Sequence, residues 1–203
     1  MSCILNIETS TSVCSVALSM DGEVLFAKAS FDGPSHAALL GVFVEEALSV
    51  LKKKGKKALD AVAVSSGPGS YTGLRIGVSV AKGLCFGFGI PLIGIHTLDI
   101  MAATVNSKGD SQIVSMTDNC LYCAMLDARR MEVYAAIYDA SLKPVRETKA
   151  DIVEVGTYAS YLEKGKVCFF GNGASKCKSV SFSPFSPIKR LPPDKWCFLI
   201  TVS

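Results

Sequence analysis

The sequence predicts an α/β fold over residues 1 to about 106, and three observations carry this prediction. Strand-like apolar runs and helix-length segments alternate in the order β-β-β-α-β-α-β-α. A glycine-rich turn, Gly67 to Gly73, separates one such strand from a long apolar helix. Hydrophobic residues make up 49% of the 203-residue chain and charged residues 19%, which favours a large core and excludes a disordered protein.

Three short strands open the chain. The first runs from Ile4 to Glu8 and the second from Ser12 to Ser19. Asp21-Gly22 is a hairpin turn signal, after which Glu23 to Ser30 runs back.

Ser35 is a suitable N-cap for the first helix, because its hydroxyl can accept from a free amide of the first turn. The remaining elements expected in this half are a helix from about His36 to Leu51, a strand Leu59 to Val64, a helix Leu74 to Phe88, a strand Pro91 to Ile95 and a helix Leu98 to Val105.

Residues 107–203 predict a smaller second α/β domain, joined by a polar linker at 106–111. Strand-like runs cover Leu121 to Asp127, Glu132 to Tyr138 and Val167 to Phe170, and Ser141 to Pro144 is a turn. From about Ser179 the sequence is rich in serine and proline without helical period. No internal sequence repeat is present.

Charge and cysteine usage limit the function classes. A net charge of +3 is too small to argue for direct nucleic-acid binding. The one basic run, Lys52 to Lys57, lies where a helix should end and complements its dipole; a phosphate or RNA contact is the alternative. Eight cysteines without a secretory signal favour reduced thiols in the cytosol. Arg75 and Lys82 interrupt the best candidate for a membrane span.

The second helix has too little polar surface for an ordinary surface helix. Between Leu74 and Phe88 only a narrow stripe is polar, namely Arg75, Ser79 and Lys82. Small residues recur four apart at Gly73, Gly77, Ala81 and Cys85, a spacing that lets another helix approach closely. We therefore expect a protein–protein interface on the two helices; burial of both in a large core is the alternative.

Three segments together resemble the TsaB (YeaZ) family. They are Ile7 to Ser10, Ser65 to Gly77 and Leu126 to Tyr134, and the resemblance covers about residues 1 to 175. It implies an actin/Hsp70-like (ASKHA) ATPase fold, with two ribonuclease H-like lobes around a cleft. The lobes would be residues 1–106, which carry the dimerisation helices, and 107–203. Chains of this family usually continue past Ala174 into a helix that packs back on the fold, so the resemblance implies that the tail from about Ser179 is truncated, frame-shifted or divergent.

The resemblance also implies a role in tRNA modification. TsaB-like proteins are non-catalytic subunits of the complex that forms N6-threonylcarbamoyladenosine at position 37 of ANN-decoding tRNAs. The implied partners are a catalytic TsaD-like subunit and a TsaE-like ATPase, with tRNA reached through the complex. A homodimer is implied when the protein is alone, with no membrane association.

The resemblance implies that the two helices form the dimer interface. Its expected residues are His36, Leu39, Leu40, Phe43, Tyr71, Leu74, Arg75, Gly77, Val78 and Ala81. The catalytic paralogue holds a metal with two histidines four apart on a helix. Here His36 is followed at that spacing by Leu40, so we expect neither a catalytic residue nor a metal site.

A weak nucleotide-binding signal surrounds the first turn. Glu8, Thr9 and Ser10 occupy the place where ATPases of this fold meet phosphate, and Gly67 and Gly69 precede a helix N-terminus. The turn lacks the lysine of a P-loop, so a structural turn that shapes the interface is favoured over nucleotide binding by this subunit alone. We expect no cofactor of the chain's own, with ATP or ADP and Mg²⁺ bound in the assembled complex.

Two further features have alternative explanations. Cys120 and Cys123 have the spacing of a zinc or redox pair, but on a strand they point to opposite faces, so buried thiols are favoured. Asp127 with Arg129 and Arg130 at a strand end suits a structural salt bridge or a partner contact. The rival functions are a free-standing ATPase or small-molecule kinase of the same fold, and a homodimeric interaction module.

Overall fold

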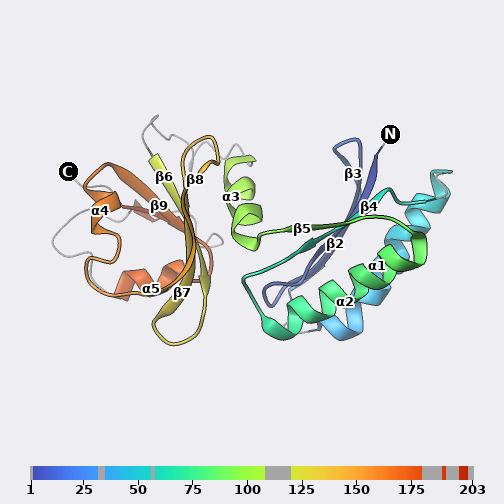
Figure 1. Ribbon diagram of the computed structural model, residues 1–203, viewed down its shortest axis with the longest axis horizontal. Helices are drawn as coiled ribbons and strands as arrows, with labels where there is room; N and C mark the ends of the chain where they lie inside the picture. The colour runs from blue at the N-terminus through green and yellow to red at the C-terminus, as the bar shows by residue number, and fades with distance from the viewer. Residues whose placement is uncertain are drawn as a thin grey trace. The chain divides into compact units, whose positions relative to one another are not determined.

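The computed structural model describes residues 2–31, 35–55, 58–107, 120–179, 189–190 and 197–200. The chain divides into two compact units, Met1–Thr97 and Leu98–Ser203. Figure 1 labels their elements. The division falls at the start of the third helix, whereas the sequence suggested a linker at 106–111, most of which lies outside the described residues.

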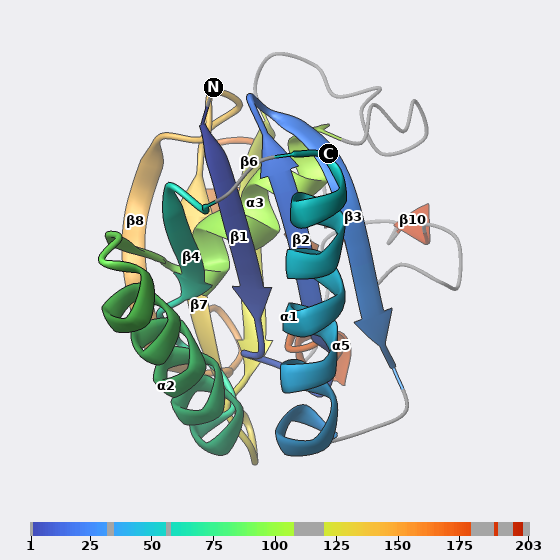
Figure 2. The ribbon, with the colours of Figure 1, turned by 90° about the vertical axis from the view of Figure 1, so that its right-hand side faces the viewer.

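Unit 1 is one mixed sheet with two helices on one face. Its elements are β1 (Cys3–Glu8), β2 (Cys14–Met20), β3 (Glu23–Ser30), α1 (His36–Lys53), β4 (Ala61–Ser65), α2 (Tyr71–Phe88) and β5 (Leu92–Ile95). The strand order is β3-β2-β1-β4-β5; β1, β2 and β3 are antiparallel neighbours, and β4 runs parallel to β1 and to β5. Figure 2 shows α1 and α2 packed against the same face.

The core of unit 1 follows strand periodicity. Alternate residues of β1, such as Leu5 and Ile7, are buried against the helices, while Ile4 and Asn6 face the other way. The helix α1 buries large side chains there, including Leu40 and Phe43. The helix α2 buries only small residues, which are Gly73, Gly77, Ala81 and Cys85.

Unit 2 is built on a second sheet. The chain enters it through α3 (Thr97–Ser107), and the further elements are β6 (Cys120–Asp127), β7 (Glu132–Tyr138), β8 (Pro144–Ile152), α4 (Ala159–Leu162), β9 (Lys166–Phe170), α5 (Ala174–Ser179), β10 (Lys189–Arg190) and β11 (Cys197–Ile200). The strand order is β10-β11-β9-β6-β7-β8.

The two units repeat one topology. In each, three antiparallel strands form a meander, and a fourth strand runs parallel to the first on its other side. This is the ribonuclease H-like order 3-2-1-4. The units differ at the fifth strand, because β5 is parallel to β4 whereas β11 is antiparallel to β9. The repeat therefore exists in three dimensions although none is visible in the sequence.

Helices of unit 2 pack on both faces of its sheet. On one face, Leu98 and Ala102 of α3 meet a cluster that includes Cys120. On the other, Tyr158 and the residues of α4 meet a cluster that includes Cys123. The expected opposite orientation of these two cysteines is confirmed, so they cannot share a ligand. The six described cysteines that are buried carry thiols outside any disulfide.

Several element boundaries differ from the predictions for local reasons. The strand β2 begins at Cys14 instead of Ser12, because Thr11 Oγ1 accepts from Val13 N and holds a bend there. The helix α2 begins at Tyr71 instead of Leu74, since Ser70 Oγ accepts from Gly73 N and caps the helix. Ser35 is the N-cap residue of α1, as predicted, but its side chain makes no capping hydrogen bond.

The strand β8 was not predicted. Its sequence, Pro144 to Ile152, is mostly exposed and charged, since it lies at the edge of the sheet, so it lacks the apolar alternation of an inner strand. Within the described ranges, the helices lack the length and apolar character that a bilayer crossing requires.

A hydrogen bond between α3 and β7 predicts that the protein is less stable to unfolding at alkaline pH. Tyr138 Oη donates to Asp99 Oδ1 at 2.6 Å, and the tyrosine is 3% exposed. Burial, reinforced by this hydrogen bond, raises the pKa of Tyr138 above its ordinary value of 10.0. Because the folded-state pKa is raised, the contact stabilises fully below about pH 10 and its contribution falls as the unfolded phenol ionises above that pH.

We expect Tyr138→Phe to lower the free energy of unfolding by about 1.5–3 kcal/mol at neutral pH, as for a hydrogen bond to a charged group. The loss should shrink above about pH 10. Urea unfolding followed by circular dichroism at a series of pH values measures this, with Tyr71→Phe, at an exposed position, as the control. A pH-independent difference between wild type and Tyr138→Phe would contradict the assignment.

Candidate functional site

The two sequence motifs of unit 1 meet at the N-terminus of α2. Ser70 N donates to the carbonyl oxygen of Ser10 at 2.6 Å, which joins the glycine-rich turn to the turn after β1. Within the latter turn, Ser10 N donates to Glu8 Oε1 at 2.6 Å. Thr9 N faces Ser65 Oγ at 3.5 Å. The predicted residues Glu8, Thr9, Ser10, Gly67 and Gly69 are thus brought together in one junction.

Glycines allow the N-terminal part of α2 to approach the turn after β1 closely. A Cβ at Gly69 would overlap the backbone oxygen of Ser10, and one at Gly73 would overlap that of Thr9. A Cβ at Gly77 would meet Thr9 Oγ1. We call Gly69, Gly73 and Gly77 the glycine ridge. It lets the backbone of α2 rest directly on the turn after β1.

This packing bears on the nucleotide assignment. Thr9 and Ser10 are 0% and 2% exposed, and their hydroxyl oxygens have no hydrogen-bond partner among the described residues. Glu8 Oε1 accepts from Ser10 N. Within unit 1, the N-terminal turn of α2 packs directly on these residues. The five-residue nucleotide assignment stays a prediction, and this geometry gives it no support.

A second junction of the same construction lies in unit 2. A Cβ at Gly171 would overlap the carbonyl oxygen of Met125. Asn172 Oδ1 accepts from Asp127 N at 2.9 Å, and Lys176 Nζ donates to Asp127 Oδ1 at 2.7 Å. The ion pair confirms the structural reading of Asp127.

The neighbouring arginines of this turn are exposed. Arg129 and Arg130 have φ values of 71° and 46°, in the left-handed region that non-glycine residues rarely adopt. Arg129 N donates to Asp127 Oδ1 at 2.6 Å, which helps hold the turn. A partner contact by the two arginines stays a prediction.

His36 has a structural position. It is 5% exposed, and its Nε2 lies 3.3 Å from the carbonyl oxygen of Val13, so it ties the start of α1 to the segment before β2. Leu40, which stands where the paralogue has its second histidine, is 1% exposed in the core. A two-histidine metal site cannot form on this helix face.

The structure separates the ten predicted interface residues into three groups. His36, Leu40, Phe43, Gly77 and Ala81 are buried within unit 1; Leu39, Leu74 and Val78 are half-buried; Tyr71 and Arg75 are exposed. The buried five are available to a partner only by shaping the surface above them. The interface assignment itself stays a prediction.

The small-residue stripe of α2 does not form the exposed contact surface that we expected. Gly73, Gly77, Ala81 and Cys85 face the protein's own sheet and first turn, not an incoming helix. Helical spacing shows that such residues share a face, but it does not say what that face contacts. The prediction that another helix approaches through this stripe was therefore wrong.

The opposite side of α2 is exposed. Tyr71, Arg75, Lys82 and Phe86 lie on this side at helical spacing, and we call them the outer stripe. Tyr71 is 74% and Phe86 92% exposed. Arg75 lies over the Tyr71 ring at 5.3 Å and donates to its Oη at 3.2 Å.

Phe86 was missing from the predicted interface, although its position four residues after Lys82 could have identified it. Aromatic residues and arginine are enriched at protein interfaces, as at Tyr71, Arg75 and Phe86 here.

Known proteins resemble this chain over most of its length. The family model described as "TsaD: tRNA N6-adenosine threonylcarbamoyltransferase" matches residues 32–178. The TsaB protein of Escherichia coli (strain K12) is 38% identical over 139 residues, which are 66% of this chain and 54% of that protein. The chain belongs to the TsaB/YeaZ family.

A second curated TsaB protein is similar to this chain. The TsaB protein of Haemophilus influenzae is 34% identical over 131 residues, covering 64% of this chain and 51% of that protein. The chain thus spans about half the length of the curated relatives that it matches.

A solved structure of YeaZ from Pseudomonas aeruginosa superposes with a TM-score of 0.60 at 29% identity, over 75% of this chain and 68% of that one. A second, described as similar to "peptidase YEAZ", gives 0.62 at 29%, over 74% and 67%. Together with the repeated strand order, these matches confirm the predicted actin-like ASKHA fold class.

Two alanine substitutions in α2, one in the glycine ridge and one outside it, test the role of the ridge. Gly73→Ala should lower the free energy of unfolding by about 1–3 kcal/mol, because the methyl group overlaps a backbone oxygen that cannot move freely. Gly83→Ala, on the exposed side with open space around it, should raise the same quantity by about 0.4–1 kcal/mol. Urea unfolding of both variants tests this, and equal changes in the two would contradict the ridge.

Proposed function

We propose that the protein is a non-catalytic subunit of the cytoplasmic machinery that forms N6-threonylcarbamoyladenosine in tRNA. Family membership supports this role, since the relatives are named tRNA threonylcarbamoyladenosine biosynthesis proteins. The protein binds a TsaD-like catalytic subunit, a TsaE-like ATPase contacts that complex, and tRNA is reached through the complex. In the absence of these partners, the chain forms a homodimer through α1 and α2.

The observation that carries this proposal is the outer stripe of α2. Its four residues present two aromatic rings and two cations outside the core of unit 1. Phe86, at 92% exposed, is the most exposed of the large apolar side chains in the described residues. Such a side chain gains most by burial against a partner, because contact removes nearly its whole ring from water.

The residues of α1 favour a non-catalytic role. His36 is held by the Val13 carbonyl oxygen and Leu40 is in the core, so the paralogue's metal-binding pair has no counterpart here. Among the described residues, histidine, cysteine and carboxylate side chains form no cluster of three that could hold a metal. As part of the same proposal, ATP or ADP, with Mg²⁺, binds in the assembled complex.

We expect Phe86→Glu to weaken heterodimer formation with the TsaD-like subunit by about thirtyfold or more, the loss typical of an aromatic anchor residue. Val155→Glu, which changes a 72% exposed residue of unit 2, is the matched control. Sedimentation velocity of mixtures at several concentrations measures the affinity. If wild type and TsaD-like subunit do not associate, the proposed role is wrong; if Phe86→Glu associates normally, only the assigned surface is wrong.

The rival role, a free-standing ATPase, makes a different prediction. We expect the isolated chain to show no saturable binding of Mg-ATP in calorimetric titration, because α2 fills the turn after β1. Tight binding that Glu8→Ala abolishes would favour the ATPase instead.

A further inference from the structure

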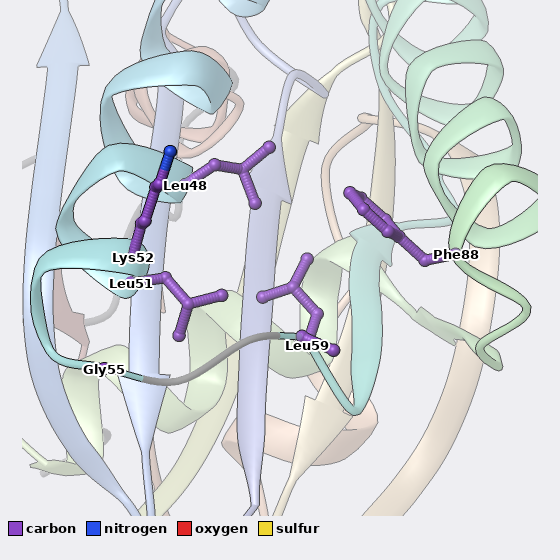
Figure 3. A pocket seen from close by; sticks show the side chains of 7 residues that line it. Leu48, Leu51, Lys52, Gly55, Leu59 and Phe88 are labelled. Atoms are coloured by element: carbon purple, nitrogen blue, oxygen red, sulfur yellow. The ribbon is translucent and has the colours of Figure 1, made fainter.

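A hollow lies in unit 1 between the C-terminal parts of α1 and α2. Its volume is about 490 Å³. It is lined by Leu48, Leu51, Lys52, Gly55, Ala58, Leu59 and Phe88. Figure 3 shows Leu48 and Leu51 reaching toward Leu59 from α1, with Phe88 reaching from α2 on the opposite side. The outer stripe does not contribute to its lining.

The walls of the hollow are apolar and only partly closed. Leu51 and Leu59 are 4% and 2% exposed, so they form a sealed inner wall. Phe88 is 48% exposed at the opposite side, so about half of its surface is open to water. An apolar group that enters would cover this ring and displace water from the leucines, which is favourable in proportion to the area covered.

The charge at the rim has one sign. Lys52 is the charged residue among the described lining residues, and none of them is acidic. Lys53 and Lys54 follow it at the exposed end of α1. Within the described part of the chain the ion pairs use other lysines, Lys28 and Lys176, and leave Lys52 available. A ligand with an anionic head would therefore meet a complementary rim.

We propose that this hollow binds a small anionic amphiphile, a carboxylate attached to an aliphatic or aromatic body of roughly ten heavy atoms. The body would lie among the leucines and Phe88, and the carboxylate would pair with Lys52. The size suits this class, since ligand pockets span about 300–1,000 Å³ and combine apolar walls with a few polar groups. The proposal stands apart from the proposed function, because it uses neither the outer stripe nor a catalytic partner.

The first test uses two probes of equal chain length and opposite charge. Sodium octanoate and octylammonium chloride are titrated into the purified full chain by isothermal calorimetry. We expect octanoate to bind saturably, with one molecule per chain, and octylammonium to bind at least about tenfold more weakly, because its head group meets like charge at the rim. Equal binding of the two probes, or no saturable binding of octanoate, would overturn the proposal.

Variants then locate the site. Lys52→Met should weaken octanoate binding about threefold to fivefold, as expected for an exposed ion pair. Lys82→Met, which removes an exposed lysine of α2 outside the lining, should leave it unchanged. Ala58→Phe, at an exposed lining position, should abolish binding by filling the hollow. Urea unfolding confirms that each variant folds.

Each alternative gives a distinct result. If Lys82→Met weakens binding as much as Lys52→Met, the attraction is a general surface effect and the assigned site is wrong. If Ala58→Phe binds octanoate as wild type does, the probe lies elsewhere. If an acidic tryptophan-containing peptide binds the hollow and octanoate does not, the occupant is a protein segment and the small-ligand proposal is overturned.

Discussion

Contact between the glycine ridge of α2 and the turn after β1 is the constraint on which unit 1 depends. It sets how near the helix lies to the sheet, because at Gly69 and Gly73 the backbone meets the backbone oxygens of Ser10 and Thr9. It also ties the two motifs of the unit into one junction through Ser70 N and the Ser10 carbonyl oxygen. The exposed outer stripe follows from this arrangement, because the fully buried residues of α2 are small and Tyr71 and Phe86 lie outside the core.

The same construction serves both units with different chemistry. In unit 1 the junction is closed by serine and threonine, in unit 2 by the Asp127–Lys176 ion pair and Asn172. In each case a glycine after the fourth strand rests on the end of the first strand or on the turn that follows it. A shared geometry with unrelated side chains explains why the duplicated fold is visible in the strand order and not in the sequence.

Much of the fold could be predicted from the sequence. Strands such as Leu121 to Asp127 are apolar on both faces and bounded by turn signals, so their patterns survive in the structure as β6. The strand β8 could not be recognised, because an edge strand has solvent on one side and its pattern is set by charge. The packing of α3 with unit 2 depends on contacts of Leu98 and Ala102 with distant strands, which local sequence does not encode.

The candidate site was harder to predict than the fold. The family motifs identified the junction, since their glycines are needed wherever two backbones touch. The direction of the small-residue stripe could not be deduced, because a spacing of four fixes a face without fixing its neighbour. The importance of Phe86 depends on its exposure, which only the three-dimensional arrangement shows.

The two sides of α2 are under separate constraints. The side that carries Gly73 and Gly77 is fixed by atomic overlap, so almost any substitution there damages the fold. The side that carries Arg75 and Phe86 touches little of its own chain and can change at small cost to folding. Binding preference can therefore drift through surface substitutions alone, and a duplicated gene of this family could acquire a new partner while its product keeps the same scaffold.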